Sequence, residues 1–191
     1  MIKGIIAGIA LTLVVGLLIG YLLVRSGRIP ANADAEPGKL ETWMAGTSLT
    51  ATLHRQAPTE QNPVALTDQN LSEGVDLFAQ NCAVCHGSAR GDDAASPIAK
   101  GLYQKPPQFA TEGVEDDPEG FSYWKIKHGI RLTAMPSFSR ALSDREMWTI
   151  ALFLKHMDKL PPAVQAKWER VQNWPMKTVP ASNVPAAKTT E

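Results

Sequence analysis

The sequence predicts an α-helical protein that begins with a membrane-spanning helix. The first apolar run, Gly4 to Val24, contains no charged residue. At about 1.5 Å per residue, a helix of this length crosses the roughly 30 Å hydrocarbon layer of a bilayer. Apolar side chains then recur at helical spacing in two later segments, one leading into a pair of cysteines and one following a capping box. The 191 residues leave room for one ordinary domain plus extensions.

We expect the N-terminal segment, residues 1–25, to be a retained membrane anchor. The alternative is a cleaved signal peptide, because the Ala-Asn-Ala sequence at 31–33 resembles a small-residue cleavage site. The apolar part of a signal peptide spans only about 7 to 15 residues, and Arg25 and Arg28 lie between this run and that site. Lys3 precedes the run and the two arginines follow it, so charge alone does not orient the span.

Residues 26–67 are polar and rich in Ala, Pro and Thr, which predicts a flexible linker. A coil of about 40 residues has a typical end-to-end distance of about 35 Å, which would let a small domain swing between neighbouring complexes. The stretch from Leu40 to His54 is more apolar than a spacer needs, with Trp43, Met44, Leu49 and Leu53. It could form a short helix against a partner or the following domain, but we favour an irregular segment.

The compact domain is expected to span residues 68–160 and to begin with a helix. One face of that helix carries residues at positions i, i+3, i+4, i+7 and i+11, namely Leu71, Gly74, Val75, Phe78 and Cys82. A glycine inside a helix costs about 1 kcal/mol relative to alanine. We therefore expect a packing reason for Gly74, namely the close approach of the domain's last helix.

That last helix is predicted from a capping box formed by Ser143 and Glu146. The apolar face that follows is made of Met147, Ile150, Ala151 and Leu154, widened by Trp148 and Leu152.

Residues 161–191 are expected to form a short helix through Trp168 and Val171, followed by a disordered tail from about Pro175. Two tryptophans, Trp168 and Trp174, are unusual so near a polar end. We expect them to clamp the extension onto the domain, with contact to a membrane partner as the alternative.

The sequence Cys82-Ala83-Val84-Cys85-His86 follows the first helix of the domain, and Cys-x-x-Cys-His is typical of c-type haem attachment. Two thiols at this spacing can each add across a vinyl group of one porphyrin, and the adjacent imidazole can then bind the iron. A structural zinc site needs about four ligands, whereas the chain has two cysteines and four histidines that lack zinc-finger spacing. A thioredoxin-type redox pair, which needs a βαβ setting, and a simple disulfide remain the alternatives.

Charge excludes one class of partner. The formal net charge is zero, whereas nucleic-acid binding calls for a basic stripe or a high pI. We therefore expect no nucleic-acid partner.

Residues 68–160 resemble a class I c-type cytochrome. The resemblance rests on Gly74 with Phe78, Cys82 to His86, Pro106-Pro107, Ala134-Met135-Pro136-Ser137-Phe138, and the final helix with Trp148. It implies a small all-α domain wrapped around one covalently attached haem c, bound through Cys82 and Cys85. It also implies that the first and last helices of the domain cross over the haem edge.

The resemblance implies that His86 and Met135 are the axial ligands of the iron. The position of Met135 in a loop, just before Pro136 and upstream of a capped helix, supports this independently. The rival is His128, expected at the end of a short helix that Gly129 terminates, where a histidine can simply interact with the helix dipole. By the same resemblance, a backbone carbonyl near Pro97 is expected to orient the second ring nitrogen of His86.

Two axial protein ligands leave the iron no open position, so we expect an electron-transfer protein rather than an enzyme, with no small-molecule substrate. The expected function is to carry single electrons between membrane complexes of a respiratory or photosynthetic chain. The alternative is a fixed haem c subunit of a larger membrane oxidoreductase. A ligand-binding haem enzyme or gas sensor would require that Met135 does not bind the iron.

The resemblance also implies haem attachment on the far side of the bacterial plasma membrane, hence a single-pass protein with a periplasmic haem domain. We expect redox partner proteins to dock transiently through charged patches. One candidate is the acidic loop of Glu112, Glu115, Asp116, Asp117 and Glu119. The favoured candidate, the basic group, comprises Lys125, Lys127, Arg131 and Arg140 around the Met135 segment, which in the family borders the exposed haem edge.

Overall fold

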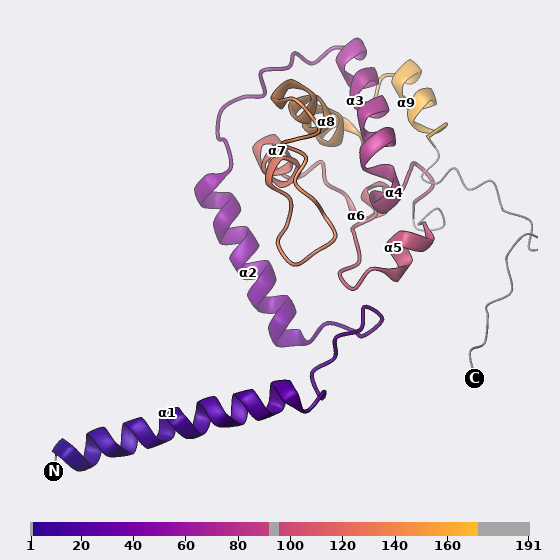
Figure 1. Ribbon diagram of the computed structural model, residues 1–191. Helices are drawn as coiled ribbons and strands as arrows, with labels where there is room; N and C mark the ends of the chain where they lie inside the picture. The colour runs from indigo at the N-terminus through magenta and orange to yellow at the C-terminus, as the bar shows by residue number, and fades with distance from the viewer. Residues whose placement is uncertain (1, 92–95, 172–191) are drawn as a thin grey trace, which may run out of the picture. The chain divides into compact units, whose positions relative to one another are not determined.

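The computed structural model describes residues 2–91 and 96–171, and within these ranges the chain forms helices and loops without strands (Figure 1). The predicted all-α class is therefore confirmed. The chain divides into two compact units, Met1–Glu36 and Pro37–Glu191.

The first unit contains α1, Ile2–Arg25, a helix of 24 residues. Its apolar side chains are exposed all round, as in a helix that meets lipid rather than a protein core. By length and composition it can cross a membrane, in agreement with the predicted N-terminal span.

The second unit begins with α2, Lys39–Gln56, where we favoured an irregular segment. That expectation was wrong. The prolines that suggested a linker, Pro37 and Pro58, lie outside the helix and bracket it. Towards its C-terminal end the helix docks, because the side chain of Leu53 is buried and the ring of His54 meets that of Phe121 edge-on at 5.2 Å.

The centre of the second unit is the crossing of α3, Asp68–Asn81, with α8, Asp144–His156. The predicted faces of both helices are buried, and the capping box of Ser143 and Glu146 is present. A Cβ at Gly74 would lie 2.6 Å from Phe153 Cβ and 2.7 Å from the Thr149 carbonyl oxygen. The packing reason expected for Gly74 is therefore confirmed.

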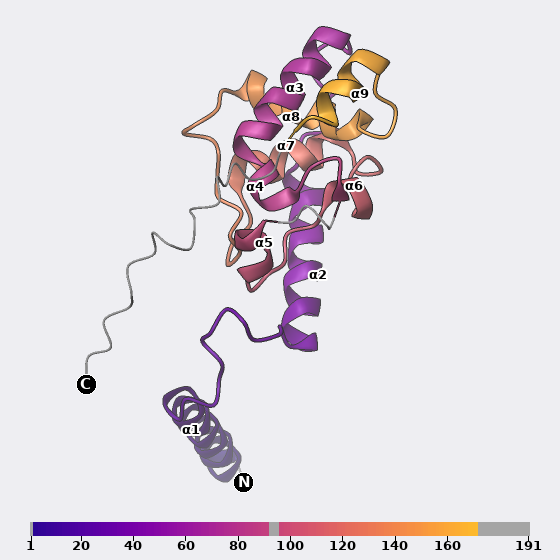
Figure 2. The ribbon, with the colours of Figure 1, turned by 90° about the vertical axis from the view of Figure 1, so that its right-hand side faces the viewer.

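Two further helices complete the core, α7, Glu119–His128, against α8 and α9, Pro162–Trp168, against α3. The two views in Figures 1 and 2 show α3, α8 and α9 side by side. The buried ring of Trp168 contacts Phe78 and Phe153, with centroids 5.4 and 5.2 Å away. Trp168 thus clamps the extension onto the domain as expected, whereas Trp174 and the expected disordered tail fall outside the described residues.

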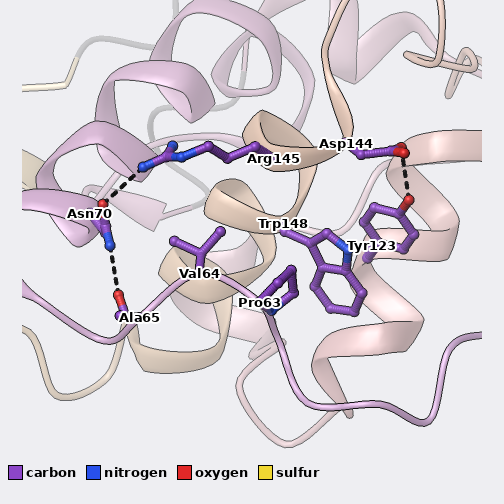
Figure 3. A pocket seen from close by; sticks show the side chains of 8 residues that line it. All are labelled: Pro63, Val64, Ala65, Asn70, Tyr123, Asp144, Arg145 and Trp148. Atoms are coloured by element: carbon purple, nitrogen blue, oxygen red, sulfur yellow. Dashed lines mark hydrogen bonds between the residues drawn. The ribbon is translucent and has the colours of Figure 1, made fainter.

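The segment just before α3 also joins this core. Figure 3 shows Pro63, Val64 and Ala65 beside α7 and the start of α8, in a pocket lined by Tyr123 and Trp148. The side chain of Val64 is buried. The polar groups at the rim are paired with each other, since Asn70 bonds Ala65 and Arg145 while Tyr123 donates to Asp144 at 2.8 Å. The pocket is therefore a seam where the segment packs onto the helices.

The contact at Gly74 gives a test of the fold. Changing Gly74→Ala forces a methyl group into the backbone and Cβ of α8, and overpacking of this kind costs about 1–3 kcal/mol. Gly46→Ala on α2 is the matched control, because a Cβ there meets nothing within 4 Å and alanine favours helix by up to about 1 kcal/mol. Denaturant unfolding should show a loss of stability for the first variant alone. Equal stabilities of the two variants would contradict the tight crossing.

Candidate functional site

The Cys-x-x-Cys-His sequence forms a tight turn that continues directly from α3. Cys82 ends α3, with its amide donating to Phe78 at 2.8 Å, and residues Ala83–His86 form the short helix α4. The amides of Cys85 and His86 both donate to the Cys82 carbonyl, at 3.0 and 2.9 Å. The buried face of α3 therefore fixes where both thiols and the imidazole lie.

Two polar side chains from distant loops hold the remaining carbonyls of this turn. The Ser96 hydroxyl donates to the Val84 carbonyl at 2.5 Å and also caps α5, Pro97–Gly101. Gln108 Nε2 donates to the Cys85 carbonyl at 2.9 Å and to the Pro106 carbonyl at 3.0 Å. Both Ser96 and Gln108 are buried. Since the Gly87 amide donates to the Ala83 carbonyl at 3.0 Å, each carbonyl from residue 82 to 85 accepts a hydrogen bond.

Sequence reasoning missed Ser96 and Gln108. They lie 12 and 23 positions from the carbonyls that they bind. A Ser-Pro pair signals a helix start, so the cap of α5 could have been found, but nothing in the sequence indicates where the free hydroxyl proton points. For Gln108 the sequence carries no comparable signal.

His86 is oriented by the carbonyl of Pro107, 3.0 Å from its Nδ1, and not by a carbonyl near Pro97 as we expected. Pro97 lies in the first turn of α5, whereas two consecutive prolines keep residues 106 and 107 out of a helix, which leaves their carbonyls available. A carbonyl oxygen can only accept, so Nδ1 carries the proton and Nε2 keeps its lone pair. The ring of Phe109, at the start of α6, Phe109–Glu112, stacks on the imidazole at 4.3 Å.

Burial sets the protonation of these groups. Loss of hydration lowers the pKa of His86 below its ordinary value, although the bond to Pro107 opposes the shift. Burial, with a smaller contribution from neighbouring Cys85, raises the pKa of Cys82 to about 12, and burial also raises the pKa of Cys85. The imidazole is therefore neutral and both thiols are protonated at neutral pH. A thioredoxin-type pair needs a thiol of lowered pKa, so the shifts speak against that alternative.

Met135 lies in a loop that the end of α7 holds in place. Its carbonyl accepts from the Ile130 amide and its amide donates to the Thr133 hydroxyl, both at 3.1 Å. Gly129 has φ +69°, and a Cβ there would come within 2.7 Å of the Met135 carbonyl oxygen, so the chain can only turn this tightly at a glycine. The Met135 side chain is half-buried against the same core as Cys82 and Phe109.

The other histidines are engaged elsewhere. His128 ends α7 and is followed by Gly129, as predicted, and its exposed ring lies 4.8 Å from that of Trp124. His156 Nδ1 lies 2.9 Å from the Leu152 carbonyl of its own helix.

The residues of the turn fit a haem c group. Two protonated thiols on one turn suit thioether formation, the lone pair of His86 Nε2 suits iron, and the thioether of Met135 stands at the rim of the same core. Partly buried apolar side chains that pack against the same core, and that would be available to a porphyrin, include Ala89, Phe109, Phe138 and Leu142.

The bond from Gln108 gives a test of how the turn is held. Gln108→Ala should lower the free energy of unfolding by about 0.5–1.5 kcal/mol, because it removes the donor of the partly buried Cys85 carbonyl. Gln69→Ala, at an exposed position of α3, is the matched control. Urea unfolding checks both variants, and a loss no greater than that of the control would show that the bond does not support the turn.

Comparison with known proteins agrees with the geometry. The family model described as "Cytochrome C oxidase, cbb3-type, subunit III" matches residues 69–154, which include the Cys-x-x-Cys-His turn and Met135. Among solved structures, a chain of the Kuenenia stuttgartiensis reducing HAO-like protein complex is similar, with 24% identity and a TM-score of 0.40. The likeness covers 58% of this chain and 54% of that one, so this chain spans about half of its length.

Comparison with the curated proteins gives no match. The family match and the all-helical fold lead to one assignment. Residues 69–154, a little under half of the chain, match the c-type cytochromes, a family whose haem c serves in electron transfer, and the N-terminal apolar helix fits membrane anchoring.

Proposed function

We propose that this protein carries single electrons between membrane redox complexes through one haem c. The group would be attached covalently at Cys82 and Cys85, with His86 and Met135 as the axial ligands of the iron. The observation that carries the proposal is the bond between His86 Nδ1 and Pro107, which leaves Nε2 as the free lone pair beside two thiols of the same turn.

When bound, haem c supplies an iron that accepts and releases one electron, and methionine–histidine ligation favours a relatively high reduction potential. The residues of the chain keep both ligands in place. Pro107 and Phe109 fix the orientation of the imidazole, and the bonds of Met135 to Ile130 and Thr133 fix the loop. Such a rigid site favours electron transfer, because little structure has to change with the oxidation state.

The division that we propose is an anchor at 1–25, a linker at 26–67, the cytochrome domain at 68–160 and an extension at 161–191. The anchor would cross the bacterial inner membrane once, with the cytochrome domain on the periplasmic side. The flexible part of the linker is shorter than its sequence suggests. Since α2 docks onto the domain, only residues 26–38 remain between the two helices. A coil of that length has a typical reach of roughly 20 Å rather than about 35 Å.

Because the segment between α1 and α2 is short, a second candidate function is that of a fixed haem c subunit of a larger membrane oxidoreductase. Co-purification in a mild detergent separates the two, since a fixed subunit stays with its complex and a free carrier does not. A third class, a haem enzyme or gas sensor, requires an open position on the iron.

The basic group proposed for partner docking contains residues that are paired with acidic side chains and residues that are not. Lys125 pairs with Asp117 at 2.7 Å, and Lys127 pairs with Asp144 at 2.8 Å. Arg131 and Arg140 are exposed, and neither forms an ion pair within residues 2–91 and 96–171. We therefore assign docking to these two arginines on either side of Met135 and not to Lys127.

Met135 provides the direct test of ligation. The native ferrous protein should not bind carbon monoxide, whereas Met135→Ala should bind it and should have a lower reduction potential, because a position on the iron opens. Met44→Ala, at an exposed position of α2, is the control and should behave as the native protein does. Optical titration with carbon monoxide decides, and binding by the native protein would favour the sensor or enzyme class.

The docking surface can be probed with a small anion. Oxidation of the ferrous protein by ferricyanide should slow severalfold at low ionic strength when Arg131 and Arg140 are both changed to glutamate, and the rates should converge as salt screens the charges. Changing Arg55 and Arg170, exposed arginines on α2 and after α9, to glutamate alters the net charge equally and is the control. If ferricyanide oxidises both double variants equally slowly, the net charge of the protein and not the Met135 loop determines the rate of oxidation.

A further inference from the structure

One face of α2 exposes large apolar side chains near the start of the helix. Leu40, Trp43 and Met44 keep 67%, 66% and 57% of their surfaces exposed. They are spaced at i, i+3 and i+4, so they form one stripe, which we call the α2 stripe.

Three of the residues through which α2 docks lie on its opposite face, whereas His54, whose ring contacts Phe121, lies at the far end of the helix from Leu40, Trp43 and Met44. Glu41 accepts a hydrogen bond from the Tyr103 hydroxyl at 2.7 Å, Leu49 is half-buried and Leu53 is buried. At about 100° per residue, the centre of this docked face lies roughly 170° around the helix from the centre of the α2 stripe. The stripe therefore faces away from the described core, and docking of α2 does not account for it.

The position of the stripe in the chain indicates what covers it. Only residues 26–38 separate the last residue of α1 from the first of α2. Thirteen residues reach at most about 45 Å when fully extended, and typically roughly 20 Å. With α1 in a membrane, as proposed, the start of α2 would lie within that distance of the lipid surface.

The chemistry of the stripe suits that surface. Tryptophan is enriched where membranes meet water, since its ring is apolar and its N–H is polar. A helix with an apolar stripe and a polar opposite side can lie in this interface with its apolar side chains among the headgroups and upper acyl chains. A protein partner is the competing occupant, but the short link to the proposed anchor α1 favours lipid.

We propose that the α2 stripe rests in the lipid headgroup region of the membrane that α1 spans. This inference rests on the proposed anchoring. Contact at the stripe would hold the cytochrome domain in one orientation, because α2 is docked to the domain through Leu53 and through Tyr103 of the loop after α5.

The test uses the full-length holoprotein with a photoreactive benzophenone amino acid in place of Trp43. The protein is reconstituted into vesicles of phosphatidylethanolamine and phosphatidylglycerol, irradiated and analysed by mass spectrometry. We expect a lipid adduct at position 43 and none at position 166, where Ala166 is exposed on α9 and serves as the control. Equal or absent adducts at the two positions would overturn the inference.

The same variant is then irradiated in native membranes. A lipid adduct supports the inference, and an adduct to a protein overturns it in favour of a partner subunit. Recovery of the chain in the soluble fraction overturns the anchoring and the inference together, whereas a membrane-bound chain without a lipid adduct overturns the inference alone. Since the substituted side chain is exposed, the optical spectrum should not change, and this confirms that the holoprotein is folded.

Discussion

The close crossing of α3 and α8 at Gly74 is the contact on which the site depends. Backbone and Cβ of α8 occupy the space where a side chain on α3 would lie. This fixes the axis of α3 in the core, and the axis in turn fixes Cys82, whose amide still bonds within the last turn of α3. The position of the two thiols is therefore determined mainly by helix packing and only secondarily by the loop that contains them.

The turn itself is held by hydrogen bonds from two buried side chains, Ser96 and Gln108, and by the bond between His86 and the Pro107 carbonyl. Ser96, Gln108 and the Pro107 carbonyl reach it from a stretch of chain that has little helix of its own. Because the Ser96 and Gln108 side chains are buried, breaking either of their bonds leaves a buried polar side chain unpaired, at a cost greater than the bond's net contribution. With haem c bound as proposed, a site held in this way would change little between the oxidised and reduced states, as one-electron transfer requires.

The docking of α2 shortens the flexible connection between α1 and the rest of the chain. With α1 as the proposed anchor, a short connection followed by a docked helix would keep the domain nearer to the lipid surface than a long flexible tether would. Confinement raises the local concentration of the domain relative to partners in the same membrane. It suits both a carrier between adjacent complexes and a fixed subunit.

The sequence by itself determined the α-helical class, the apolar N-terminal helix, the faces of α3 and α8 and the capping box. Each of these depends on periodicity or on residues within one turn of each other. The resemblance of residues 68–160 to c-type cytochromes, too, followed from local motifs, above all Cys82 to His86 and the residues around Met135.

Only the tertiary structure decided that α2 is helical and docked, that Pro107 and not a residue near Pro97 orients His86, and that Ser96 and Gln108 hold the turn. It also showed which lysines of the basic group are already paired. These features depend on contacts between residues far apart in the chain, and one sequence carries no record of such pairings. The hydrophobic pattern gives the face of a helix, but the partner of a buried hydroxyl or amide is set by how the elements pack.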